Sequence, residues 1–174
     1  NPHGLDAEGQ YSTARDLARL MLACMDNASF AALTAERVGT AGEQSFVNHN
    51  KLLTSCAGCL GGKTGYTRAA GRCLVSAAER EGTRFVCVTL SDPDDWRDHA
   101  ALYDWAFANY VNFSLAEAAP VFTVPMLSGT RESIAVVPEG DVCVLLPRGE
   151  EKTLRAELPW FEFAPVSRGA QAGR

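Results

Sequence analysis

Apolar residues repeat at helical spacing near the start of the chain. They stand at i, i+3, i+4 and i+7: Leu17, Leu20, Met21 and Cys24. This spacing places four side chains on one face of an α-helix. Thr13 comes just before them and has the side chain of a helix N-cap, with Asp16 three residues later as in a capping box. We therefore expect a helix over residues 13–26 with this apolar face buried, followed by a short helix over residues 30–36.

A third helix is expected from about residue 96 to residue 110. Its predicted buried face consists of Leu102, Trp105, Ala106 and Phe107. Aspartates at positions 92, 94, 95 and 98 precede or open this helix, where negative charge suits the positive end of the helix dipole. A calcium loop is the alternative for these aspartates, but the glycine and terminal glutamate of an EF-hand are absent.

Extended patterns dominate the residues between the second and the third of these helices. Residues 72–80 and 83–90 are rich in apolar and β-branched side chains, and Glu81-Gly82 between them predicts the turn of a hairpin. Residues 83–90 are apolar on both faces, which is typical of a central strand with helices over it. A further short strand is expected over residues 44–47.

The helical period disappears after about residue 111. Short extended runs follow, separated by glycine and proline: residues 121–125, 133–137, 142–146 and 153–158. Short strands at this spacing predict a small β-sandwich or part of one. The sequence therefore predicts an α+β domain over residues 1–111 and a β-rich domain over residues 112–174.

Composition limits the classes of partner. The chain has 174 residues, 47% of them hydrophobic and 21% charged, with a net charge of −5. No run of lysine or arginine occurs, so we expect no nucleic-acid partner. No apolar run approaches 18 residues, so no membrane span is expected. The chain begins without methionine and ends in a polar string, and we expect it to be a piece of a longer protein whose only membrane attachment would lie in another segment.

Histidine and cysteine spacings predict no metal site and no cofactor. His3, His49 and His99 are isolated from one another, and we expect His49 to be a hydrogen-bonded loop residue rather than a catalytic base. Cys56 and Cys59 form a C-x-x-C without the second ligand pair that zinc requires. We interpret these two as loop cysteines near the site, with a disulfide left open.

Residues 61–67, Gly-Gly-Lys-Thr-Gly-Tyr-Thr, carry the most chemistry in the chain. The phosphate-binding P-loop needs G-x-x-x-x-G-K-S/T, but its first glycine would fall on Ala57, and a turn and a strand follow instead of a helix. The K-T-G strand of penicillin-recognising serine enzymes fits better, because it requires strand, turn and strand. For the tripeptide alone, a solvated glycine-rich turn remains the simpler interpretation.

Several strings in this order resemble the serine-type D-alanyl-D-alanine carboxypeptidases, the low-molecular-mass penicillin-binding proteins. They are residues 1–6 (Asn-Pro-His-Gly-Leu-Asp), 11–17 (Tyr-Ser-Thr-Ala-Arg-Asp-Leu), 48–53 (Asn-His-Asn-Lys-Leu-Leu), 61–67 and 69–72 (Ala-Ala-Gly-Arg). Residues 144–149 resemble the start of the family's β-rich second domain. The resemblance implies the C-terminal part of a β-lactamase/transpeptidase-like catalytic domain over residues 1–111. The start of a small sandwich-like domain would follow over residues 112–174.

The resemblance also implies the roles of the K-T-G residues. Lys63 would be catalytic and would supply positive charge to the cleft, Thr64 would hold the substrate carboxylate, Gly65 would give access to the strand, and the Tyr66 N–H would help to bind the oxyanion. The substrate would be a peptidoglycan stem peptide ending in D-Ala-D-Ala, with β-lactams as inhibitors and an extracytoplasmic location.

The nucleophile motifs of the family are absent from the sequence. No serine in this sequence begins a Ser-x-x-Lys or a Ser-x-Asn pattern. In the family both motifs precede the His-Gly-Leu-Asp region, so the resemblance places them before Asn1, and we expect the chain alone to be inactive. The alternatives are a non-catalytic penicillin-binding-like module that binds cell-wall peptide, a β-lactamase, and a nucleotide-binding protein.

Overall fold

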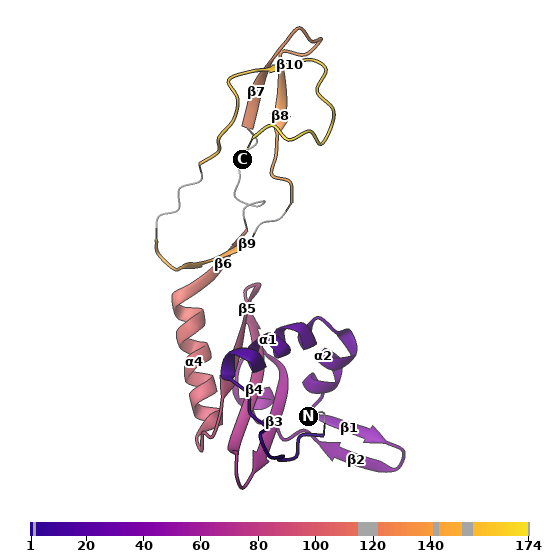
Figure 1. The fold of residues 1–174 in the computed structure, drawn as a ribbon, viewed down its shortest axis with the longest axis vertical. Coiled ribbons are helices and arrows are strands. Elements are labelled where there is room, and N and C mark those ends of the chain that lie inside the picture. Colours follow the sequence, from indigo (N-terminus) through magenta and orange to yellow (C-terminus); the bar gives the residue numbers. More distant parts are fainter. Residues whose placement is uncertain (2, 115–121, 141–142, 151–154, 174) are drawn as a thin grey trace. The chain divides into compact units, whose positions relative to one another are not determined.

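The computed structural model describes residues 1–174 except 2, 115–121, 141–142, 151–154 and 174. Contacts divide the chain into two compact units, Asn1–Asn109 and Tyr110–Arg174, which we describe separately (Figure 1). The boundary expected from the sequence, after residue 111, falls just beyond this division.

The described residues of the first unit form four helices: α1 (Ala14–Met25), α2 (Ala28–Ala35), α3 (Leu52–Ser55) and α4 (Asp95–Asn109). The three longer ones were predicted, and the predicted N-cap is confirmed, because Thr13 Oγ1 accepts a hydrogen bond from the Asp16 N–H at 3.1 Å. Asn27 caps α2 in the same way, with Oδ1 3.0 Å from the Phe30 nitrogen. The sequence did not predict α3, because a single turn is too short to show a period.

An antiparallel sheet of three strands lies between the helices: β3 (Cys59–Thr67), β4 (Gly71–Arg80) and β5 (Thr83–Thr89). The hairpin of β4 and β5 and the strand character of the K-T-G string are confirmed. The central position predicted for β5 is wrong within the described residues, since the order is β3-β4-β5. The helices predicted over this strand are confirmed, because α1 packs on one face of the sheet and α4 on the other (Figure 1).

The core consists of one apolar cluster on each face of this sheet. On the α4 face the buried members are Leu52, Cys56, Leu74, Ala78, Tyr103 and Phe107. On the α1 face they are Met21, Met25 and Ala77. Alternate residues of β5 serve the two clusters, with Phe85 and Cys87 on the first and Val86 on the second.

The predicted buried faces of both long helices need correction. Leu20 is 59% exposed on α1, and Leu102 and Trp105 are 47% and 58% exposed on α4. The buried stripe of α4 is instead a line of residues four apart: Asp95, His99, Tyr103 and Phe107. Phe107, which the sequence predicted as buried, belongs to this stripe. The other three carry polar groups whose hydrogen bonds are made inside the fold, so apolar spacing alone did not identify them.

A small hairpin of β1 (Val38–Ala41) and β2 (Gln44–Val47) precedes α3. β2 was predicted, whereas β1 was not. In the second unit, β6 (Tyr110–Ser114) pairs with β9 (Cys143–Pro147), and a second sheet has the order β10-β7-β8. The bounds of this second sheet are Glu162–Phe163 for β10, Phe122–Leu127 for β7 and Ser133–Val136 for β8.

The strands predicted near residues 121, 133 and 142 are confirmed where the structure describes them, whereas residues 121 and 142 lie outside the described part. The strand predicted over residues 153–158 is wrong for residues 155–158, and residues 153 and 154 lie outside the described part. Over the part of the chain that is described, no helix is both long and apolar enough to cross a membrane. The described chain is thus α+β, with helices in the first unit and strands in both.

Candidate active site

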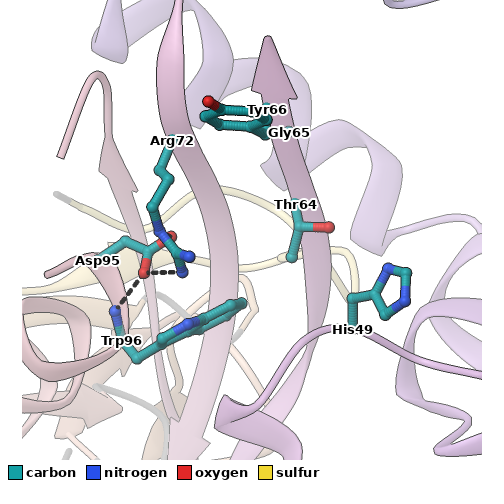
Figure 2. A pocket seen from close by; sticks show the side chains of 7 residues that line it. All are labelled: His49, Thr64, Gly65, Tyr66, Arg72, Asp95 and Trp96. Atoms are coloured by element: carbon teal, nitrogen blue, oxygen red, sulfur yellow. Dashed lines mark hydrogen bonds and ion pairs between the residues drawn. The ribbon is translucent and has the colours of Figure 1, made fainter. Parts of the chain in front are cut away.

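An open pocket of about 450 Å³ lies beside the K-T-G strand. Seven residues line it: His49, Thr64, Gly65, Tyr66, Arg72, Asp95 and Trp96 (Figure 2). They come from β3, β4, the start of α4 and the loop before α3. Three of the four residues predicted for substrate binding are therefore together at one pocket.

The strand register explains which side chains face this pocket. Thr64 stands opposite Leu74, and Tyr66 opposite Arg72, so these four share the sheet face that α4 covers. Thr64 and Tyr66 are two positions apart on β3, so both side chains point to this face, and Tyr66 is 72% exposed.

Lys63, the predicted catalytic residue, does not line this pocket. It stands opposite Val75, which packs against the α1 cluster, so Lys63 points to the other face of the sheet. Its side chain is exposed, and its Nζ donates a hydrogen bond to the Thr64 carbonyl oxygen. The strand therefore presents a hydroxyl to one face and an ammonium group to the other.

β3 has an open edge. Within the described sheet it pairs only with β4, so the backbone N–H and C=O groups along its other edge can bind an extended chain. Gly65 lies on this strand, and a Cβ there would find Cys73 at 3.9 Å, an ordinary contact. At Gly62, in contrast, a Cβ would lie 2.4 Å from the Val75 oxygen. The packing of the fold therefore requires glycine at position 62. At position 65 the packing of the fold does not require glycine.

Arg72 brings a positive charge into the pocket. Its Nε and Nη2 donate hydrogen bonds to the two carboxylate oxygens of Asp95 at 3.2 and 2.6 Å, and its guanidinium lies 5.4 Å from the centre of the Trp96 ring. The hydrogen bond to Asp95 is the main cause that raises the pKa of Arg72. Asp95 is buried, whereas the Arg72 side chain is 40% exposed. Figure 2 shows the guanidinium held beside Asp95 and Trp96, with Thr64 across the pocket.

The ion pair of Arg72 and Asp95 was not predicted from the sequence. We interpreted Asp95 as one of several aspartates at a helix start, and Arg72 as part of a strand. The two residues are 23 positions apart and on different elements. Because α4 packs against β4, the fold brings them together, and a local spacing rule does not detect such a pair.

Two of the three histidines have distinct surroundings. His49 lies in an exposed loop, as expected, and also lines the pocket, but the hydrogen bond predicted for it is not found among the described residues. His99 is fully buried, with Nδ1 2.8 Å from Ser76 Oγ and Nε2 3.2 Å from Thr89 Oγ1. Burial lowers the pKa of His99 to about 4, so the imidazole is neutral near pH 7. His99 does not line the pocket, and its role is to join α4 to the sheet.

The cysteines are free thiols. The expectation of loop cysteines is confirmed for Cys56, which lies in the turn after α3 and is 8% exposed within the α4 cluster. It is wrong for Cys59, which is the first residue of β3. Among the described residues, no group of three or more His, Cys, Asp and Glu side chains is placed to hold a metal ion.

Comparison with known proteins agrees with this geometry. The family profile for D-alanyl-D-alanine carboxypeptidase matches residues 1–94. The chain is 31% identical over 180 residues to the D-alanyl-D-alanine carboxypeptidase DacC of Escherichia coli, covering 98% of this chain and 45% of that protein. It is 42% identical over 119 residues to the D-alanyl-D-alanine carboxypeptidase DacB2 of Mycobacterium tuberculosis, covering 62% of this chain and 41% of that protein.

A solved structure supports the fold. Penicillin binding protein 5 from Haemophilus influenzae superimposes with a TM-score of 0.73 at 28% sequence identity, over 99% of this chain and 53% of that one. The chain spans less than half the length of the two curated relatives described above. The match of the family profile to more than half of the chain shows the relationship. This chain belongs to the D-alanyl-D-alanine carboxypeptidase family of serine-type peptidases.

Proposed function

We propose that this chain supplies the K-T-G side of the active site of a serine-type D-Ala-D-Ala carboxypeptidase. The enzyme removes the terminal D-Ala from peptidoglycan stem peptides through an acyl-enzyme and is inhibited by β-lactams. The observation that carries the proposal is the meeting of Thr64, Gly65 and Arg72 at one pocket beside an open strand edge.

Substrate binding follows from this edge. An extended peptide pairs with the free backbone groups of β3, and Gly65 lets it approach without meeting a side chain. A terminal carboxylate then accepts hydrogen bonds from the Thr64 hydroxyl and from the guanidinium of Arg72, which Asp95 holds in place. The Tyr66 N–H follows on the same strand and donates to the oxyanion that forms at the carbonyl under attack.

The covalent step needs a serine from outside these 174 residues, because no serine here has a lysine three positions later. In the proposed reaction that serine attacks the penultimate D-Ala carbonyl, its partner lysine takes the proton, and the terminal D-Ala leaves. Water then hydrolyses the acyl-enzyme. Lys63 stabilises the negative charge that develops in the transition state, from the sheet face opposite Thr64.

The proposed function implies a domain organisation, a location and a set of partners. Residues 1–111 form the C-terminal part of the catalytic domain, and residues 112–174 begin a β-rich second domain. The substrate is part of the cell wall, so the enzyme acts outside the cytoplasmic membrane. The partners are the stem peptide and, as inhibitors, β-lactams.

A second candidate is a non-catalytic module that binds cell-wall peptide. The lack of Ser-x-x-Lys in this sequence is the observation that favours it. Both candidates use the same strand edge and the same carboxylate site, so peptide affinity alone does not separate them.

Intact-mass analysis of the whole protein after incubation with a penicillin separates the two candidates. The carboxypeptidase gains the mass of one penicillin, and the adduct maps to a serine in a Ser-x-x-Lys sequence. A folded protein that binds wall peptide and gains no mass is the non-catalytic module instead.

A further inference from the structure

Cys56 and Cys59 stand at the two ends of a tight turn that leads into β3. The Cys59 N–H donates a hydrogen bond to the Cys56 oxygen at 3.3 Å, and Gly58 between them has a φ of 79°. These are the features of a type II β-turn, whose first and fourth Cα atoms lie less than about 7 Å apart. Disulfides join Cα atoms that are about 4.4–6.8 Å apart, so the turn brings the two Cα atoms to about the separation that a disulfide spans.

The backbone of this turn is fixed to β4. The Glu79 N–H donates to the Gly58 oxygen at 2.9 Å, and Arg80 Nε donates to the Ala57 oxygen at 3.0 Å. A Cβ at position 58 would lie 2.3 Å from the Glu79 oxygen, so the close approach requires glycine. The turn therefore keeps the two cysteines at this separation in the folded protein.

Each of the two thiols has a nitrogen donor nearby. Arg80 Nη2 lies 3.8 Å from Cys56 Sγ. The Asn50 side chain is 2% exposed, and its Nδ2 has no hydrogen-bond partner in the described chain. Burial raises the pKa of the Cys59 thiol overall, whereas a backbone hydrogen bond with Gly61 and, to a smaller extent, the Asn50 side chain lower it. Both cysteines also pack against the α4 cluster, so their side chains share one environment.

We propose that Cys56 and Cys59 form a reversible disulfide that closes this turn and fixes the start of the K-T-G strand. The bond is independent of the carboxypeptidase function, since it needs only the turn. The oxidant is a low-molecular-mass disulfide, such as oxidised glutathione.

The exchange runs in two balanced steps. One cysteine thiolate attacks the glutathione disulfide, forms a mixed disulfide and releases one glutathione thiolate. The second cysteine thiolate attacks the protein sulfur of that mixed disulfide, forms the Cys56–Cys59 bond and releases the second glutathione. The two thiol protons end on the two reduced glutathione molecules, which also carry the two electrons.

Peptide mapping of the whole folded protein tests the proposal. The protein is incubated with oxidised glutathione at about pH 8, where more thiolate is present. It is then denatured, alkylated with N-ethylmaleimide and digested with trypsin. Cleavage after Lys51 and Lys63 gives the peptide 52–63, which contains these two cysteines and no other.

The expected peptide is unalkylated and lighter than its reduced form by two hydrogen atoms, and dithiothreitol restores two alkylation sites. Cys59→Ser abolishes this species, whereas Cys143→Ser, at an exposed cysteine of the second unit, leaves it unchanged. A 52–63 peptide that carries two alkyl groups after oxidation overturns the proposal. A stable glutathione adduct, or a bond to any other cysteine, also overturns it.

Discussion

The carboxylate of Asp95 holds the guanidinium of Arg72 through two hydrogen bonds, of 3.2 and 2.6 Å. Asp95 is at the start of α4, and Arg72 is on β4. The ion pair therefore ties the first turn of a helix to the wall of the pocket. Because Asp95 is buried and Arg72 is partly exposed, the aspartate orients the arginine and leaves its charge accessible to a ligand.

Removing the Arg72 side chain should weaken recognition of a carboxylate. In the whole protein, we expect Arg72→Ala to lower the second-order rate constant of acylation by a penicillin by about tenfold, since a charge-assisted hydrogen bond is lost. Stopped-flow acylation, with a fluorescent penicillin, measures this constant.

Arg84→Ala is the matched control, because Arg84 pairs with Glu79 on β4 and does not line the pocket. It should acylate at the wild-type rate. Equal acylation rates for Arg72→Ala and Arg84→Ala would show that Arg72 does not contribute to binding the penicillin.

Two of the three glycines of β3, Gly62 and Gly65, separate an effect on folding from an effect on binding. Gly62→Ala places a Cβ 2.4 Å from the Val75 oxygen, and we expect it to lower the free energy of unfolding by about 1–3 kcal/mol through overpacking. Gly65→Ala meets no such contact, so its thermal midpoint should stay at the wild-type value while acylation slows by about tenfold or more.

Thermal unfolding and acylation are measured on the same preparations of both variants. A Gly65→Ala protein with normal acylation would show that ligands do not approach this part of the strand. A Gly62→Ala protein of wild-type stability would contradict the packing argument.

Much of the fold was predictable from local pattern. The cap at Thr13, the turn at Glu81-Gly82 and the strand character of the K-T-G string follow from residue types at short range. The pocket was predictable only in part. Thr64, Gly65 and Tyr66 belong to one motif, whereas Arg72, Asp95 and Trp96 reach the site through the packing of α4 on β4.

The buried face of α4 shows why apolar spacing failed. His99 and Tyr103 are polar, and both are buried because Ser76 Oγ lies 2.8 Å from each of them. Trp105 is apolar and 58% exposed. Prediction from apolar spacing treats a polar residue as a surface residue. It does not reveal the hydrogen-bond partner of His99 in the core, Ser76, which is 23 positions away in the sequence.

His99 predicts a pH dependence of stability. Its pKa is about 4 in the folded protein and 6.5 when unperturbed, because burial opposes protonation more than Asp95, Asp92 and Asp98 favour it. As the pH falls through 6.5 the unfolded chain takes up the proton first. The contribution of His99 to the free energy of unfolding is therefore fully present above about pH 6.5 and decreases as the pH falls. The decrease levels off near pH 4, with a total loss of about 3 kcal/mol.

Chemical denaturation of the whole protein between about pH 7.5 and 4.5 measures this slope. Carboxylates titrate in the same range, so the informative quantity is the difference from His99→Gln, which has no imidazole to protonate. The variant should lose less stability on acidification than the wild type. Parallel curves would show that His99 is not the group responsible.

We propose that the strand with Lys63, Thr64 and Gly65 is an active-site strand. The most direct test of this proposal is the rate of acylation of the whole protein by a penicillin after Lys63→Ala. Lys63 is exposed, so the substitution should leave the thermal midpoint unchanged, while loss of its charge slows acylation by about a hundredfold or more. Lys51→Ala, at another exposed lysine outside the pocket, should acylate normally. Acylation of Lys63→Ala at the wild-type rate would contradict the assignment of this strand to the active site.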